Sequence, residues 1–229
     1  MKFILDPTPE LLTFDCYGTL IDWDSSLRDY VGKLLLRKGS DLTVSTFYDR
    51  WYYQHALPML SGPFKIYRAL LKDSLRDALA GAGLDLNESD GDDFGDAMAH
   101  AEPFADTVEV LRRLSKRYRL GIISNSQDDI VSHAVDRMDN LFEFVITAET
   151  TRTYKPHPAL FELILSRAGV PAERTVHIAQ SQYVDLPRSV PMGMRTIWIN
   201  RNSQTLNDGT PAPHAVLPNL EGLPDLLDA

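Results

Sequence analysis

The feature that most constrains the fold of this chain is a series of short apolar runs, the later of which alternate with segments of helical periodicity. Five runs are typical of buried strands, because each is apolar and is followed by polar or turn residues. They are Leu11–Phe14, Leu120–Ile123, Phe144–Thr147, Thr175–Ala179 and Thr196–Ile199. Strands that alternate with helices favour an α/β protein with a parallel sheet.

The long interval between the first and second runs contains no comparable strand pattern. It instead has helical patterns near residues 25–38, 43–60, 64–81 and 91–101. Because one helix suffices for a crossover between parallel strands, we expect an inserted helical cap. The predicted domains are a core of residues 1–22 and 102–229 and a cap of residues 23–101. A lid at the strand ends would exclude water from a site there.

Charge and composition exclude several classes of partner. The chain has 23 Lys and Arg against 32 Asp and Glu, a formal net charge of −9 that repels nucleic acids and anionic membranes. No apolar segment approaches the ~18 residues of a membrane span. Cys16 is the only cysteine, which fits a reducing compartment. With only a short apolar run at the N-terminus, we expect a cytoplasmic protein without nucleic-acid or membrane partners.

Polar residues follow the predicted strands, where ligands of open α/β sheets bind. Asp15 follows the first run, Ser124 and Asn125 follow the second, Lys155 comes after the third, and the segment 180–185 follows the fourth. A carboxylate, an ammonium group and several amides should therefore converge. No GxGxxG, P-loop or GxSxG sequence is present, and the six histidines lack the spacing of a zinc site.

Four segments together resemble the motifs of the haloacid dehalogenase superfamily, in the family's order and over nearly the whole chain. They are TFDCYGTLIDW at 13–23, SNS at 124–126, TYKPHPALFE at 153–162 and IAQSQYVD at 178–185. The resemblance implies a Rossmann-like parallel core with a helical cap inserted after the first strand. It also implies that Asp15 is a nucleophile, that Thr19, Ser124 and Asn125 bind the substrate or the attacked carboxylate, and that Lys155 neutralises the site.

Tyr17 discriminates between the reactions of this superfamily. Its phosphatases place a second aspartate two residues after the nucleophile, as general acid and magnesium ligand. A tyrosine there is typical of members that hydrolyse carbon–halogen bonds, whose halide leaving group needs no proton, and Tyr17 would then contact the substrate. Because magnesium prefers several carboxylates, we expect no metal and no cofactor. Magnesium would be needed only under the phosphatase alternative.

The fourth motif differs from that of the best-known 2-haloacid dehalogenases, which reads Ser-Ser-Asn-x-x-Asp. This chain has Gln180, Ser181 and Gln182 in its place, although Asp185 matches. By the resemblance, Asp185 would orient or activate the hydrolytic water. Gln180 and Gln182 keep hydrogen-bonding capacity for the substrate, and Phe161 stands where those enzymes have a tyrosine. These differences leave the substrate open.

The cap of haloacid dehalogenases supplies an arginine for the substrate carboxylate or halide. Arg50 is the nearest match, although a register shifted by one residue puts Asp49 there, and Tyr67 and Arg68 are second candidates. The aromatic residues within 47–53 should form the core of the cap, with one or two of them lining an apolar pocket. Exposed apolar positions on the cap would permit a homodimer.

Three functions remain open on the sequence alone, each with a small anionic molecule as partner. The favoured function is hydrolysis of a small 2-haloalkanoic acid to the 2-hydroxy acid through an ester of Asp15. The second is a phosphatase acting on a small phosphate ester, which lacks a general acid because of Tyr17. The third is a binding or regulatory protein with little turnover, for which Gln180, Gln182 and Phe161 are the only indications.

Overall fold

The computed structural model describes residues 6–229 and contains a six-stranded sheet in the order β3-β2-β1-β4-β5-β6. Every pair of neighbouring strands is parallel. The strands are β1 (Leu11–Phe14), β2 (Arg119–Ser124), β3 (Phe144–Thr147), β4 (Thr175–Ala179), β5 (Arg195–Ile199) and β6 (Ala215–Leu217). The predicted α/β class and parallel sheet are confirmed.

Strand β1 is central and carries the start of the first motif. It pairs with β2 on one side and β4 on the other, so that Thr13 stands opposite Gly121 and His177. Every residue of β1 and β4 is buried. Strands covered on both faces need apolar residues at nearly every position, which explains the continuous apolar runs in the sequence.

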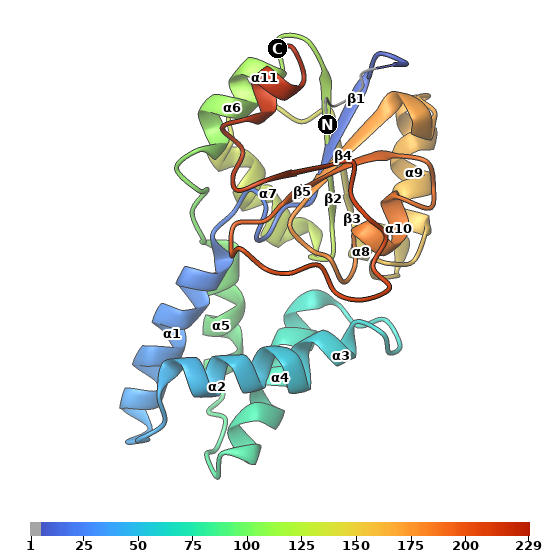
Figure 1. The fold of residues 1–229 in the computed structure, drawn as a ribbon. Helices are drawn as coiled ribbons and strands as arrows, with labels where there is room; N and C mark the ends of the chain where they lie inside the picture. Colours follow the sequence, from blue (N-terminus) through green and yellow to red (C-terminus); the bar gives the residue numbers. More distant parts are fainter. Residues whose placement is uncertain (1–5) are drawn as a thin grey trace.

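Helices cover both faces of the sheet (Figure 1). On one face, α6 (Thr107–Leu114), α7 (Asp128–Arg137) and α11 (Leu223–Leu226) contribute to the largest buried apolar cluster. On the other face lie α8 (Ala148–Thr151), α9 (Ala159–Ala168) and α10 (Leu186–Ser189), with the short helix η2 (Ala172–Arg174) before β4. Leu160, Phe161 and Ile164 of α9 pack there against Ile123 and Ile146.

The segment between β1 and α6 forms a separate helical lobe, which Figure 1 shows beside the end of the sheet where β1 leads into α1. It consists of α1 (Trp23–Arg37), α2 (Val44–Arg50), the π-helix η1 (Trp51–Ala56), α3 (Leu57–Met59), α4 (Tyr67–Gly81) and α5 (Asp90–Ala99). The lobe has its own buried cluster around Trp51, whose indole N–H donates to Ser74 Oγ at 2.9 Å. Ile130 of α7 is the only buried member of this cluster from outside the lobe among the described residues.

The chain enters and leaves the helical lobe at one place. Ile21 forms an antiparallel bridge with Pro103, and the backbone N–H of Asp22 donates to the carbonyl of Glu102 at 2.9 Å. The backbone N–H of Phe104 donates to the carbonyl of Leu20 at 3.0 Å. No helix within residues 6–229 is long and apolar enough to cross a membrane.

The elements differ from the sequence expectation in two respects. The helix expected over 43–60 is one continuous helical segment whose middle turn, η1, has π geometry. Strand β6 lies in the region expected to be only loop and a final helix, and pairs with β5 at the edge of the sheet. The expected loop over 202–213 contains no helix or strand, and the expected final helix is α11.

Candidate active site

Asp15 comes directly after β1, at the edge of the sheet that faces the helical lobe. Its backbone N–H donates to the carbonyl of Ile178 at 3.0 Å. Gly18 has a φ of +92°, in the region that favours glycine. The turn at Gly18 returns the chain so that the Thr19 hydroxyl donates to Asp15 Oδ2 at 2.7 Å, while the N–H of Gln180 donates to Thr19 Oγ1 at 2.8 Å.

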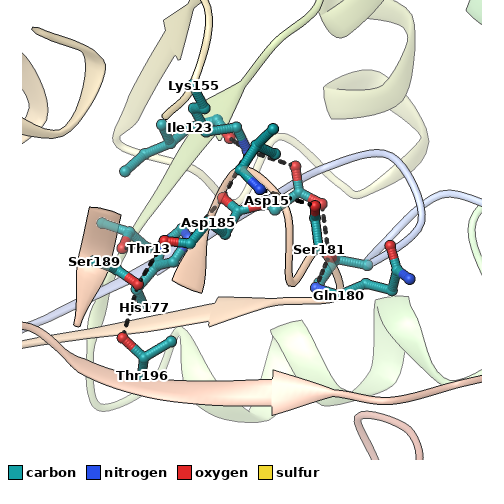
Figure 2. A network of polar contacts seen from close by, with 12 residues as sticks. Thr13, Asp15, Ile123, Lys155, His177, Gln180, Ser181, Asp185, Ser189 and Thr196 are labelled. Atoms are coloured by element: carbon teal, nitrogen blue, oxygen red, sulfur yellow. Dashed lines mark hydrogen bonds and ion pairs between the residues drawn. The ribbon is translucent and has the colours of Figure 1, made fainter. Parts of the chain in front are cut away.

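Lys155 lies between two carboxylates (Figure 2). Its Nζ is 2.8 Å from Asp15 Oδ1 and 2.8 Å from Asp185 Oδ1, and it donates to the carbonyl of Ile123 at 3.0 Å. The three N–H groups of the ammonium therefore have three acceptors. The side chains of Lys155 and Asp185 are almost entirely buried, whereas Asp15 keeps a small exposed area.

Burial and charge act in opposite directions on this cluster. Burial raises the pKa of Asp15, and the nearby charge of Lys155 offsets only part of that effect. Burial also opposes ionisation of Asp185, but Lys155 and His177 leave its pKa below the usual value. Burial alone would lower the pKa of Lys155, yet the two carboxylates raise it. The cluster therefore holds a charged ammonium, and its carboxylates differ in acidity.

A cavity of about 80 Å³ lies between Asp15 and the helical lobe. Asp15 and Lys155 line its floor. Trp23, Tyr52, Leu57, Leu60, Tyr67 and Met98 line it from the lobe. A small, largely apolar cavity with a few charged and polar groups is typical of a site for a small organic substrate.

The last residue of β2 and the residues that follow it supply hydroxyl and amide groups to the same cavity. Ser124 Oγ accepts from the N–H of Ser126 at 3.2 Å, so its own hydrogen is available to donate. Ser126 Oγ is buried and has no hydrogen-bond partner among the described residues. Asn125 is fixed by Lys155, because its Oδ1 accepts from the backbone N–H of Lys155 at 2.6 Å.

Tyr17 and Gln180 also line the cavity. The Tyr17 hydroxyl donates to the carbonyl of Ile130 at 3.0 Å, and burial raises its pKa well above that of a free tyrosine. Tyr17 therefore contributes an aromatic ring to the cavity, and its proton is engaged by α7. Gln180 is half-buried and lines this cavity as well as a neighbouring one of about 140 Å³.

Three other residues predicted to bind substrate lie outside the cavity: Thr19, which is buried and bound to Asp15, Gln182 and Arg50. Gln182 is buried, but its side chain accepts from the N–H of Asn207 at 2.7 Å and donates to the carbonyl of Thr205 at 3.2 Å. It therefore holds the loop before β6. Arg50 lines neither cavity, whereas Asp49 lines only the neighbouring one.

Arg68, the second arginine candidate of the lobe, forms ion pairs outside the cavity. Arg68 Nη1 is 2.8 Å from Asp96 of α5, and its Nε is 2.8 Å from Asp129 of α7. Its backbone N–H donates to Gln127 Oε1 at 2.7 Å. Arg68 thus joins the helical lobe to the core and does not line the cavity.

The sequence analysis did not single out two residues that complete the polar network. His177 of β4 has its Nε2 3.0 Å from Asp185 Oδ1, and Thr13 of β1 has its Oγ1 2.9 Å from His177 Nδ1. The available signal was a histidine and a threonine within apolar runs that pair in the sheet. Ser126, within the SNS segment, was likewise quoted without a role.

Three comparisons relate this chain to known proteins. The (S)-2-haloacid dehalogenase of Pseudomonas putida is 27% identical over 222 residues, which cover 91% of this chain and 92% of that protein. Haloacetate dehalogenase H-2 of Moraxella sp. (strain B) is 26% identical over 221 residues, which cover 95% of this chain and 97% of that protein. A crystal structure of an L-2-haloacid dehalogenase superimposes with a TM-score of 0.83 and 28% identity, covering 96% of this chain and 99% of that one. A family model described as haloacid dehalogenase-like hydrolase matches residues 9–186.

Proposed function

The chain belongs to the haloacid dehalogenase-like hydrolases, and from this membership we propose that it hydrolyses the carbon–halogen bond of small 2-haloalkanoic acids. The product is the 2-hydroxy acid. The observation that carries the proposal is the Asp15 carboxylate, which lines a small cavity and is held between Lys155 and Thr19. The names of the relatives, which are 2-haloacid and haloacetate dehalogenases, support the same substrate class.

The first half-reaction is a displacement at carbon by Asp15. An oxygen of the carboxylate attacks C2 of the substrate, an ester bond forms, the carbon–halogen bond breaks, and the halide leaves with the bonding electrons. No proton transfer is needed, which fits the presence of Tyr17 two residues after Asp15. Thr19 and Lys155 fix the orientation of the carboxylate, and a fixed, partly desolvated carboxylate is a better nucleophile than a solvated one.

The second half-reaction is hydrolysis of the Asp15 ester. A water oxygen attacks the ester carbonyl carbon, Asp185 accepts a proton from that water, and the bond between that carbon and the substrate oxygen breaks. The departing ester oxygen takes the proton from Asp185, and the regenerated Asp15 carboxyl loses the second proton of the water to solvent. Because only the first step occurs at C2, the configuration at C2 is inverted once. Asp185 shares Lys155 with Asp15 and therefore lies close to the ester.

Recognition of the substrate carboxylate is assigned to the residues at the end of β2 and directly after it. Ser124 has an available hydroxyl hydrogen, and the Ser126 hydroxyl has no partner among residues 6–229. Asn125 and Gln180 supply amides to the same cavity. The helices of the lobe act as a cap, because Tyr52, Leu57, Tyr67 and Met98 present apolar surface to the bound molecule and keep water from it.

The phosphatase alternative needs a general acid and a magnesium site that these residues do not form. The position of the general acid is taken by Tyr17, whose hydroxyl group already donates its hydrogen bond to the carbonyl of Ile130. The ammonium of Lys155 occupies one oxygen of Asp15 and one of Asp185, and a divalent cation at those two oxygens would have to displace it. Among the described residues, no group of three or more His, Cys, Asp and Glu side chains could hold a metal ion. We therefore propose a reaction that is independent of magnesium.

The deciding experiment compares two substrate panels. Halide release from 2-chloro, 2-bromo and 2-fluoro acids is measured with chelator present, and phosphate release from small esters is measured with magnesium. We expect halide release that chelator does not affect. Phosphate release that depends on magnesium would replace the proposal with the phosphatase. Ligand binding without turnover in either panel would instead favour a binding protein. The cytoplasmic location and the homodimer stay predictions from the sequence, and sedimentation analysis tests the homodimer.

A further inference from the structure

Two buried polar side chains lie beneath Asp185, in the interior of the sheet (Figure 2). Thr13 of β1 and His177 of β4 are register partners, and both are fully buried. Their side chains are linked by the 2.9 Å contact between Thr13 Oγ1 and His177 Nδ1. The imidazole packs edge-on against Phe161 at a centroid distance of 5.2 Å. A histidine held from three sides in this way has a fixed ring orientation.

The donor in the contact between His177 and Asp185 follows from the chemistry of the two groups. An ionised carboxylate oxygen can only accept hydrogen bonds. Asp185 Oδ1 lies 3.0 Å from His177 Nε2, so Nε2 must carry a proton whether the imidazole is neutral or charged. Besides His177, the titratable and charged groups that act on Asp185 in the cluster are Lys155 and, on the far side of that ammonium, Asp15.

The two oxygens of Asp185 are treated differently by their surroundings. Oδ1 accepts from both Lys155 Nζ at 2.8 Å and His177 Nε2 at 3.0 Å. Oδ2 is buried and has no hydrogen-bond partner among the described residues. The backbone carbonyl of Asp185 accepts from the Ser189 hydroxyl at 3.0 Å, which fixes the start of α10. Two donors on one oxygen therefore hold the plane of the carboxylate, and Oδ2, which is buried behind the residues that line the cavity, has no donor among the described residues.

We infer that His177 is a positioning residue for the second half-reaction, in which it holds Asp185 so that Oδ2 receives the proton of the hydrolytic water. The inference rests on the proposed function. His177 does not line the cavity and does not touch the substrate. Its loss would leave Lys155, which already serves Asp15, as the single donor to Asp185 Oδ1. The first half-reaction does not use Asp185 as a base and should be unaffected.

The test compares His177→Leu with His177→Gln by rapid-quench kinetics on a 2-haloacid. Glutamine can present an N–H donor near the place of Nε2, whereas leucine is apolar and cannot. In the leucine variant we expect a halide burst of normal rate, accumulation of the Asp15 ester, and a kcat lowered about tenfold or more. The acidic limb of kcat should move to higher pH, and the glutamine variant should restore much of the loss. Thr175→Val, which removes a buried hydroxyl at the other end of β4, is the matched control.

Equal losses in the leucine and glutamine variants, or a burst that slows as much as turnover does, would reduce His177 to a packing role. If the wild type itself releases no halide, the proposed function fails and the inference falls with it. A second measurement does not need turnover. Nitrogen NMR of the wild type should show a protected proton on His177 Nε2 whose resonance moves in Asp185→Asn. An unprotonated Nε2 would overturn the assignment even in an active enzyme.

Discussion

Lys155 balances the charge of the buried cluster only in part. One ammonium group faces two carboxylates, so the fully ionised cluster carries a net charge of −1 inside the protein. The negative charge of Asp15 is the less stabilised of the two, because burial raises the pKa of Asp15 while the pKa of Asp185 is held below the usual value. Asp15 is also the carboxylate that lines the cavity. The residue proposed as the nucleophile is therefore the one that protonates first on acidification.

This difference predicts the pH dependence of the first half-reaction. Asp15 must be ionised to attack, and its pKa is raised from 3.8. The rate constant of the halide burst should therefore fall as the pH is lowered through a value above 3.8. Pre-steady-state halide release between about pH 4 and pH 8 measures this limb. A burst rate that stays constant down to the lower limit, with the fold intact by circular dichroism, would contradict the assignment.

Asp15→Asn should abolish turnover while leaving the fold intact. The amide keeps the shape of the side chain but is not a nucleophile, and deletion of a covalent nucleophile costs about four orders of magnitude or more in rate. In the wild type, a single turnover in heavy-oxygen water should label the Asp15 carboxylate before the product. Asp136→Asn on the exposed side of α7 is the matched control and should keep full activity. Activity in the Asp15→Asn protein would show that Asp15 is not the nucleophile.

At the scale of elements, α4 joins the helical lobe to the core. Arg68 forms ion pairs with Asp129 of α7 and with Asp96 of α5, so one side chain couples three helices. All three side chains are partly exposed, and exposed ion pairs are worth about 0–1 kcal/mol each. The contact is therefore strong enough to bias the position of the lobe without locking it.

Arg68→Met should raise KM by up to about fivefold with a smaller change in kcat, because the lobe closes less firmly over bound substrate. Steady-state kinetics on the best substrate of the acid panel measures both constants. Arg76→Met breaks a pair within α4 and should leave KM unchanged. The same holds for Arg50→Ala, since Arg50 lines neither cavity. If Arg50→Ala raised KM and Arg68→Met did not, the arginine expected from the sequence would regain its role.

The elements that the sequence predicts well are those whose residues are dictated by local burial. β1 and β4 coincide with their apolar runs, because strands covered on both faces need apolar residues at nearly every position. β3 also coincides with its run, although it lies at the edge of the sheet and its first two residues are only partly buried. β6 has only three residues, and Val216 within it is half-exposed, so no periodic pattern marks it. Its position depends on pairing with β5, which is a tertiary contact.

The residues of the candidate site also fall into those that local sequence predicts and those that depend on tertiary contacts. Asp15, Ser124, Asn125 and Gln180 were predicted to converge because each directly follows a strand, and all four line one cavity. Arg50 and Gln182 are placed by the rotation of a helix and by a distant loop, which motif spacing does not determine. His177 resembles an ordinary core residue in sequence, because its partner Asp185 lies in the turn before α10 and only the folded structure brings the two together.

At the scale of the whole molecule, the formal net charge of −9 opposes the approach of anions. Within the site, Lys155 attracts a substrate carboxylate only at short range, because Asp15 and Asp185 neutralise it. Salt shortens the Debye length from about 30 Å at 0.01 M to about 8 Å at 0.15 M. Screening therefore weakens the long-range repulsion more than it weakens contacts inside the buried cavity.

We accordingly expect kcat/KM for an anionic 2-haloacid to rise about twofold to fivefold over that range of ionic strength, through a lower KM at constant kcat. Steady-state assays in sodium sulfate, whose anion is not a product of the reaction, measure the trend without halide inhibition. An uncharged osmolyte at equal osmolality is the control and should have no such effect. A kcat/KM that falls with salt would mean that an electropositive path, rather than the net charge, guides the substrate.

The antiparallel bridge between Ile21 and Pro103 joins the two ends of the helical lobe, while the lobe packs around a cluster of its own. An insert of another length or shape can therefore be spliced between these two points without shifting the register of any strand. A single gene rearrangement could replace the whole helical lobe. Point mutations within the lobe would leave Asp15, Lys155 and Asp185 unchanged. In descendants of such a chain, substrate preference can diversify quickly on one side of the splice point while the reaction chemistry is inherited unchanged on the other.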